Sequence, residues 1–304
     1  MPKKAAVLSC LGLGDALICC ILANQLYRQG YEVTLFHPSI QSAQEWFPHI
    51  GFKTYKELDL SCYEAIFIFY EKSPWMQEAI NQATTLYREK SVILNPIATP
   101  RTDYLYWENG EFDGRKPFVD NLVKYCQKKL HFVDASKETG ISPLPFLTHK
   151  KYPSRVVIHP TSSKEEKNWG KGQFLELEKK LKKAGFSPVF VVSPKEKIAW
   201  PEAISFASLS ALFAFVYESG WMIGNDSGIG HLASLLGLPT LILFRTKRGA
   251  DFWRPAWEKG KVCTPFSWIP NIKYARWREK FWRQAIPCFY VWKQFLALTQ
   301  EKGG

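Results

Sequence analysis

The stretch 224–239 combines residue types that could bind a phosphorylated sugar. It lies between two apolar runs, which predicts a strand, a tight turn, a short helix and a second strand. The glycines of the turn let a ligand approach the backbone, and the free N–H groups that begin the helix can donate to a phosphate. Asp226 would repel a phosphate but can accept hydrogen bonds from sugar hydroxyl groups. This favours a nucleotide-sugar, with candidate ligands Asp226, Ser227, Gly228, Ile229, Gly230 and His231.

A second stretch, 159–169, follows a predicted strand and precedes a predicted helix. The hydroxyl groups of Thr161 and Ser162 can donate to phosphate oxygens, and Lys167 can neutralise charge on a departing diphosphate. The sequence has no Asp-x-Asp pair in a metal-binding context, so this chemistry requires no divalent metal.

Asp15 is the candidate for acid–base chemistry. It stands at the tip of a glycine-containing loop between a predicted strand, 5–9, and a predicted helix, 16–28. This is not the dinucleotide-binding fingerprint, because Leu17 replaces the third glycine and Asp15 occupies the helix start where a pyrophosphate would lie. A carboxylate in this position can instead act as a general base.

Each candidate also has a purely structural interpretation. Asp15, Asp226 and Ser227 could only cap helices, and His231 could only pack in the core. Lys167 could be a solvated lysine on a polar surface loop.

The elements that must position these residues alternate between strand and helix. The first half predicts strands at 5–9, 31–37, 64–70 and 91–95, with helices at 16–28, 74–88 and 118–130. After a proline-containing linker, the second half predicts strands at 155–159, 187–193, 219–223 and 240–244, with helices at 172–183, 209–218, 274–284 and 289–300. We therefore expect an α/β protein of GT-B architecture, with two Rossmann-like domains, 1–150 and 151–286, and a cleft between them. The final helix, about 287–304, is expected to pack back on the first domain.

Composition indicates a globular protein of a reducing compartment. Hydrophobic residues make up 46% of the chain, which is ample for two cores. Seven cysteines without a Cys-x-x-Cys pair argue against a disulfide framework and a zinc site. We find neither a signal peptide nor an apolar stretch that could span a membrane, so we expect a cytoplasmic protein.

The net charge of +12 favours an anionic partner. The segment 245–283 holds eleven basic and three acidic residues, interspersed with aromatic residues. Such a mixture suits a membrane interface or single-stranded nucleic acid, and it could also be a solvated basic face over an aromatic core. The aperiodic segment 99–116 is expected to face an acceptor, which makes Arg101 and Arg115 acceptor-side candidates.

Three motifs resemble glycosyltransferase family 9, the family of lipopolysaccharide heptosyltransferases. The longest runs from Asp226-Ser227-Gly228 through His231-Leu232-Ala233 to Leu-Gly-Leu-Pro-Thr at 236–240. Gly-Leu-Gly-Asp at 12–15 resembles the family's N-terminal loop, and Lys167-Asn168-Trp169 matches the lysine and tryptophan of its Lys-x-Trp-Pro motif. The sequence departs from the family pattern at three positions, where glycine, proline and glycine are usual: Thr161, Gly170 and Arg245.

The resemblance implies an inverting, metal-independent glycosyltransferase without a cofactor. It favours transfer of heptose from ADP-heptose, as co-substrate, to a lipopolysaccharide-type or other lipid-linked glycan. A lipid-linked acceptor is compatible with what the basic and aromatic composition of 245–283 suggests, a peripheral contact with the inner face of the cytoplasmic membrane. In that reaction Asp15 is the catalytic base and Asp226 holds the donor sugar. Thr161, Ser162, Lys167 and the amides of 228–230 hold the diphosphate, and the acceptor-side candidates are Gly14, Arg101 and Arg115.

Two alternatives stay open. The chain could be a GT-B enzyme that uses another nucleotide-hexose. It could also be a non-catalytic basic protein that binds nucleic acid or membrane, although the family motifs disfavour nucleic acid.

Overall fold

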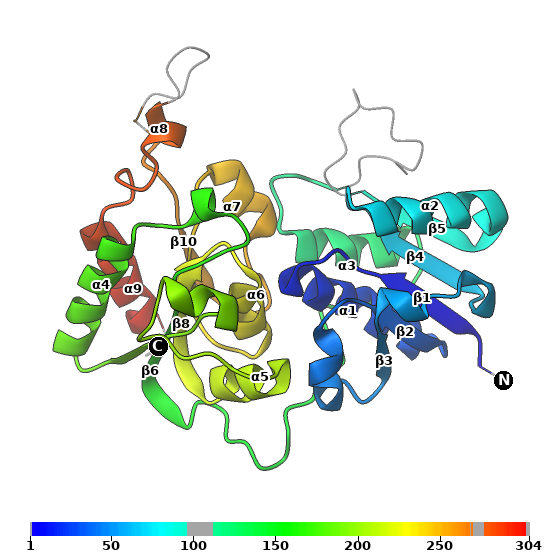
Figure 1. Ribbon diagram of the computed structural model, residues 1–304, viewed down its shortest axis with the longest axis horizontal. Helices are drawn as coiled ribbons and strands as arrows, with labels where there is room; N and C mark the ends of the chain where they lie inside the picture. Colours follow the sequence, from blue (N-terminus) through cyan, green and yellow to red (C-terminus); the bar gives the residue numbers. More distant parts are fainter. Residues whose placement is uncertain (1, 96–111, 268, 270–276, 302–304) are drawn as a thin grey trace. The chain divides into compact units, whose positions relative to one another are not determined.

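The computed structural model describes residues 2–95, 112–267, 269 and 277–301 (Figure 1). The chain divides into two compact units, one formed by Met1–Leu144 with Ser208–Ser210 and the other by Pro145–Ala207 with Ala211–Gly304. In the described part of the chain, each unit contains a five-stranded sheet in which all strand pairs are parallel. The predicted α/β class is therefore confirmed.

The sheet of the first unit has the strand order β3-β2-β1-β4-β5. Its strands are β1 (Lys4–Leu8), β2 (Glu32–Phe36), β3 (Ile50–Lys53), β4 (Ala65–Phe69) and β5 (Ser91–Leu94), and its helices are α1 (Leu13–Arg28), α2 (Pro74–Leu86) and α3 (Phe118–Lys128). Helix α1 is buried along most of its length because apolar residues surround its axis, and it packs against α3 and β2.

Strand β3 was not predicted, and it forms an edge of this sheet. On the open side of β3, the side-chain amide of Gln44 takes the place of a neighbouring strand. It accepts from the Phe52 N–H at 2.9 Å and donates to the Ile50 carbonyl oxygen at 2.8 Å. An edge satisfied by a side chain is less available for pairing with another chain.

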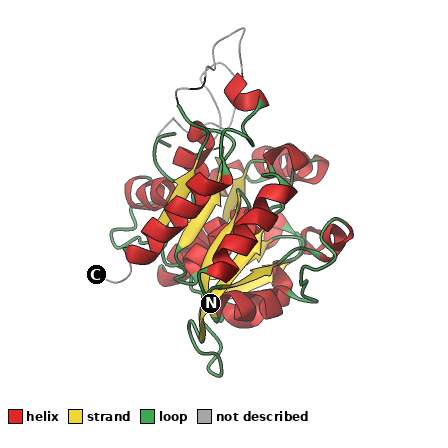
Figure 2. Cartoon of the chain, turned by 90° about the vertical axis from the view of Figure 1, so that its left-hand side faces the viewer, coloured by secondary structure: helices red, strands yellow, loops and turns green. Residues whose placement is uncertain are grey.

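The sheet of the second unit has the order β10-β9-β8-β6-β7. Its strands are β6 (Tyr152–His159), β7 (Ser187–Phe190), β8 (Ser219–Asn225), β9 (Thr240–Leu243) and β10 (Gly260–Cys263). Its helices, seen beside the strands in Figure 2, are α4 (Lys171–Lys183), α5 (Leu209–Tyr217, whose first two residues group with the first unit), α6 (Gly228–Leu235), α7 (Lys247–Trp253), α8 (Trp277–Lys280) and α9 (Cys288–Gln300). Strand β10 and helix α7, which are four and seven residues long, are not among the predicted elements.

Helix α9 belongs to the second unit, and the expected packing of the C-terminal helix on the first domain stays a prediction. Its side chains Val291, Phe295 and Leu298 are buried in the core of the second unit, where the helix packs against α4 and β10. This apolar stripe, at spacings of four and three residues, matches the apolar face of the sheet that it covers.

Both sheets have a point at which the strand order reverses. In the first sheet the chain adds β2 and β3 on one side of β1 and then β4 and β5 on the other, so the reversal lies between β1 and β4. In the second sheet the corresponding point lies between β6 and β8. Ligands of open parallel sheets bind outside the carboxyl ends of the strands at such switch points. Among the described residues, no helix is long and apolar enough to cross a membrane.

Candidate active site

An ion pair spans the switch point of the second sheet. Asp226 directly follows β8, and Lys167 ends a 3-10 turn, Glu165–Lys167, in the loop after β6. Lys167 Nζ lies 2.8 Å from Asp226 Oδ2, with 38% and 17% of the two side chains exposed. The two candidate stretches are therefore brought together, and one ligand can reach both a cation and a carboxylate.

Asn225 fastens the loop that carries Lys167. Its Oδ1 accepts from the Trp169 N–H at 3.0 Å, and its Nδ2 donates to the Pro160 carbonyl oxygen at 2.7 Å. Asn225 is fully buried, so both ends of the loop 160–169 are tied to the end of β8. Asn225 is not among the predicted site residues, although an asparagine that ends a buried strand next to a candidate carboxylate is a usable signal.

The predicted hydroxyl ligands are engaged inside the loop. Thr161 is buried, and its Oγ1 lies 3.4 Å from His159 Nε2. His159 Nδ1 lies 2.7 Å from the Val191 carbonyl oxygen, and burial lowers the pKa of this histidine, so the neutral ring donates from Nδ1. The Thr161 hydroxyl group also hydrogen-bonds the Glu196 carboxylate, whose pKa this contact lowers. Ser162 Oγ lies 2.8 Å from Asn168 Oδ1 and 2.9 Å from the Lys164 carbonyl oxygen. Their role as phosphate ligands stays a prediction.

Two buried polar atoms at the start of α6 have no hydrogen-bond partner among the described residues: Ser227 Oγ and His231 Nδ1. Ser227 is the N-cap residue by position, but its side chain makes no capping bond. Burial lowers the pKa of His231 to about 4, against the opposing effects of the Asp226 charge and a backbone hydrogen bond at Trp253. Unpaired buried polar groups are uncommon in proteins, and these two adjoin Asp226, where a ligand could supply the missing partners.

Asp15 lies in the first turn of α1, at the switch point of the first sheet, and is half-buried. Its carboxylate folds back over Gly12, the N-cap residue: a Cβ atom on Gly12 would lie 2.5 Å from Asp15 Oδ2. Gly14 is buried one residue earlier in the same turn. The position suits both a helix-capping carboxylate and a base at the carboxyl edge of the sheet.

Two residues outside the predicted set hold the loop before Asp15. Glu71, which follows β4, accepts from the Leu11 N–H at 2.7 Å. His37, which follows β2, accepts from the Ser39 and Ile40 N–H groups at Nδ1 and lies 3.1 Å from the Leu11 carbonyl oxygen at Nε2, so the ring is an Nε2–H tautomer. The signal that could have found them is a polar residue directly after an apolar strand.

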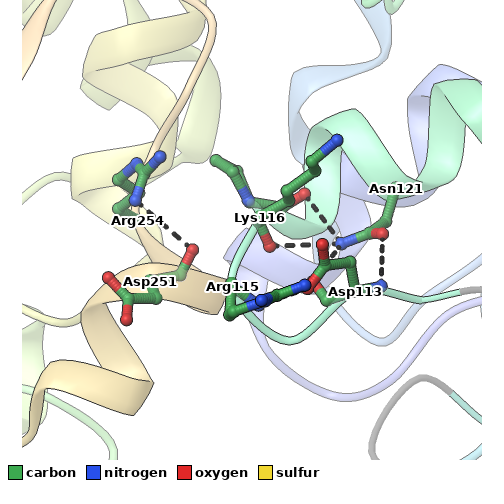
Figure 3. A network of polar contacts seen from close by, with 7 residues as sticks. Asp113, Arg115, Lys116, Asn121, Asp251 and Arg254 are labelled. Atoms are coloured by element: carbon green, nitrogen blue, oxygen red, sulfur yellow. Dashed lines mark hydrogen bonds and ion pairs between the residues drawn. The ribbon is translucent and has the colours of Figure 1, made fainter.

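The predicted acceptor-side arginines lie differently. Arg101 is outside the described residues. Arg115 is exposed and pairs with Asp113 at 3.2 Å, on a turn held by Asn121, whose side-chain amide binds the Asp113 backbone at 2.8 and 3.0 Å (Figure 3). The turn presents the Arg115 side chain to solvent, and its role stays a prediction.

The basic segment 245–283 is partly structural. Arg245, which follows β9, forms an ion pair at 3.4 Å with Glu166, the residue that precedes Lys167. Trp282 is only 3% exposed and so belongs to the core. Other members face solvent, notably Trp277 and Phe281, which are 56% and 48% exposed. The described residues contain no group of three or more His, Cys, Asp or Glu side chains that could hold a metal ion.

Gly170, one of the departures from the family pattern, has a local function. Its N–H donates to Gln173 Oε1 at 3.2 Å, so the side chain at the third position of α4 caps the backbone at the start of the helix. A proline at this position has no N–H group and could not make this bond.

Comparisons with known proteins agree on one family. Residues 124–273, about half of the chain, match the family described as Glycosyltransferase family 9 (heptosyltransferase). No curated protein sequence matches the chain.

Similar solved structures cover nearly the whole chain. An Escherichia coli ADP-heptose LPS heptosyltransferase II superposes with a TM-score of 0.67 at 15% identity, over 99% of this chain and 100% of that one. A glycosyltransferase family 9 protein of Veillonella parvula gives 0.65 at 16% identity, over 98% of each chain. The E. coli heptosyltransferase WaaC with ADP gives 0.61 at 13% identity, over 97% and 99%. These similarities establish a GT-B fold, and with the family match they identify the chain as a glycosyltransferase that belongs to glycosyltransferase family 9.

Proposed function

We propose that this glycosyltransferase is an inverting enzyme that transfers heptose from ADP-heptose to a lipopolysaccharide-type or other lipid-linked glycan. The observation that carries the proposal is the Lys167–Asp226 pair at 2.8 Å, which offers one donor molecule a cation for its diphosphate and a carboxylate for its sugar. The fold shared with a solved heptosyltransferase that contains ADP supports an adenine nucleotide.

The donor would bind at the switch point of the second sheet. Lys167 would neutralise the diphosphate and the backbone amides of 228–230 would hydrogen-bond it, with the positive end of the α6 dipole behind them. Of these amides, the Gly230 N–H already donates to the Ser227 carbonyl oxygen at 3.2 Å and would have to exchange that partner for the ligand. Asp226 accepts from sugar hydroxyl groups, and Ser227 Oγ and His231 Nδ1 gain the partners that they lack. Thr161 and Ser162 shape the loop and complete the phosphate contacts.

The acceptor hydroxyl would be activated by Asp15. As its oxygen attacks the anomeric carbon, the hydroxyl proton passes to the Asp15 carboxylate. The new C–O bond forms while the bond to the diphosphate breaks, so the configuration inverts and ADP leaves with the bonding electrons. We assign Gly14, Arg115 and Arg101 to the acceptor side, and the reaction needs no metal ion because Lys167 and the helix dipole stabilise the departing charge.

A donor-binding panel tests this proposal. We expect ADP and ADP-heptose to raise the melting temperature of the protein more than UDP, GDP or UDP-hexoses, and the Lys167→Ala variant to lose most of that effect. Stabilisation by UDP-sugars alone would replace the donor assignment with another nucleotide-hexose. Binding of oligonucleotides with a steep salt dependence and no response to any nucleotide-sugar would contradict the enzyme's proposed donor altogether.

We further propose peripheral contact with an anionic membrane through the exposed members of 245–283, at the inner face of the cytoplasmic membrane. Trp277 and Phe281 are large exposed aromatic residues, and Lys280 lies beside them. Aromatic and basic side chains together suit the headgroup region. We expect the protein to sediment with anionic liposomes at low salt, and failure to sediment would remove this proposal.

A further inference from the structure

Two residues that precede α9 hold the backbone of the turn that carries Lys167. Arg283 donates from Nε to the Asn168 carbonyl oxygen at 2.6 Å and from Nη2 to the Glu165 carbonyl oxygen at 2.8 Å. Trp282 donates from Nε1 to the Glu166 carbonyl oxygen at 3.1 Å. The carbonyl groups on both sides of Lys167 are therefore each bound by a side chain from 115 to 118 residues further along the chain.

The contacts also run in the opposite direction. Trp169 donates from Nε1 to the Ile286 carbonyl oxygen at 2.8 Å and to that of Arg283 at 3.3 Å. Gln173 donates from Nε2 to the same two oxygens at 3.2 and 2.9 Å. Trp169, Trp282 and Ile286 are almost fully buried in one apolar cluster, so the hydrogen bonds are anchored in the core. A reciprocal network of this kind, partly buried and attached to core side chains, leaves the turn little freedom.

We propose that Arg283 and Trp282 are positioning residues of the donor site, which fix the turn Glu165–Lys167 so that Lys167 meets the diphosphate. We call Arg283 and Trp282, with their hydrogen bonds to the turn, the clamp. This inference rests on the proposed function, because the clamp serves donor binding only if Lys167 binds the donor. The guanidinium fork reaches two carbonyl oxygens three residues apart. A lysine ammonium group could not bridge them in the same geometry, so the shape of Arg283 matters as well as its charge.

The test is calorimetric binding of ADP to the full-length protein and five variants: Arg283→Gln, Lys167→Ala, the double variant of these two, Arg283→Lys and Lys293→Gln. We expect Arg283→Gln to weaken ADP binding roughly tenfold, within the range of energies measured for side chains coupled in one network. In a Lys167→Ala background, Arg283→Gln should add no further loss, because Arg283 acts through Lys167. Arg283→Lys should resemble Arg283→Gln. The control is Lys293→Gln, which removes one positive charge from an exposed position of α9 and should bind ADP like the wild type.

Several outcomes would overturn the inference. Equal ADP affinity in Arg283→Gln and Lys293→Gln would show that the clamp does not position Lys167. Additive losses in the double variant would show that Arg283 acts independently of Lys167. Wild-type protein that binds no nucleoside diphosphate would contradict the proposed function as well, whereas unchanged binding in the variants contradicts the clamp alone.

A second variant keeps the test decisive if Arg283→Gln does not fold. Trp282→Phe keeps an aromatic ring in the core but removes the donor to the Glu166 carbonyl oxygen. We expect it to weaken ADP binding about threefold, with the same loss of effect in the Lys167→Ala background. Unchanged binding, in a variant whose thermal unfolding stays cooperative, would count against the clamp.

Discussion

The absence of a side chain at Gly12 leaves the space that the Asp15 carboxylate occupies. Gly12 has φ −76° and ψ 139°, a conformation open to any residue, so glycine is not required by the backbone. A Cβ atom would, however, stand 2.5 Å from Asp15 Oδ2, so the carboxylate would have to move away if position 12 carried a side chain. At this scale, the function of Asp15 can be probed without changing Asp15 itself.

The Gly12→Ala variant should therefore displace the carboxylate at little cost in stability. If Asp15 is the base, we expect Asp15→Asn to lower kcat by about 10²–10⁴-fold and Gly12→Ala to lower it by at least about tenfold, with donor affinity retained in both. The control is Gly172→Ala, where a Cβ atom would meet nothing within 4 Å and turnover should not change. Near-normal kcat in Asp15→Asn would reduce this carboxylate to a helix cap.

The loop 160–169 works as one structural element because Asn225 closes it at both ends. The side chain of Asn225 satisfies one buried donor, the Trp169 N–H, and one acceptor, the Pro160 carbonyl oxygen. A buried group left unpaired costs about 1–3 kcal/mol, so the asparagine has a larger effect than its size suggests. The loop that presents Lys167 thus depends on a neighbouring strand as much as on its own residues.

Asn225→Ala should unpair both groups and lower the free energy of unfolding by about 2–4 kcal/mol, as urea denaturation would measure. Asn225→Asp keeps an acceptor for the Trp169 N–H but loses the donor to the Pro160 carbonyl oxygen. With the aspartate protonated, its free energy of unfolding should lie between those of the wild type and Asn225→Ala. Ser163→Ala, at an exposed position of the loop, serves as control and should change stability by less than about 0.5 kcal/mol. Equal effects of Asn225→Ala and Ser163→Ala would refute the role of Asn225 in closing the loop.

On the scale of the whole molecule, each unit contains a buried histidine that stays neutral in the folded state. Burial lowers the pKa of His37, in the first unit, and of His231, in the second, to about 4. The unfolded chain binds protons at these residues near pH 6.5, so below that value it holds more protons than the folded protein. Stability is then fully present above pH 6.5 and decreases as the pH falls toward 4.

We expect each histidine to lower the free energy of unfolding by about 2 kcal/mol between pH 7 and pH 5. Urea denaturation at the two pH values, followed by a probe in each unit, would measure this. His37→Gln should flatten the pH dependence of the first unit only. His231→Gln should reduce that of the second unit only, where buried His159, whose pKa is also lowered, contributes to the remainder. A pH dependence that neither substitution changes would mean that other groups cause it.

The sequence alone determined the elements that have strong local patterns. Apolar runs such as Ala65–Phe69 and the strand that precedes Asp226 are recognisable because a strand buried on both faces needs no partner to reveal its composition. The family motifs also lie in short contiguous stretches, and the family match confirms what they indicated. Strands β3 and β10 escaped prediction because four residues carry too little periodicity, and their pairing depends on neighbours distant in the chain.

Only the tertiary structure decided which residues meet. Lys167 and Asp226 stand 59 residues apart, and they pair because β6 and β8 are neighbours in the sheet. Arg283 looked like one more charge in a basic segment, yet the packing of α9 on the second sheet brings it beneath the Lys167 turn. Local patterns follow from backbone geometry and are written in consecutive residues, whereas contacts between loops follow from strand order and helix packing, to which the whole chain contributes.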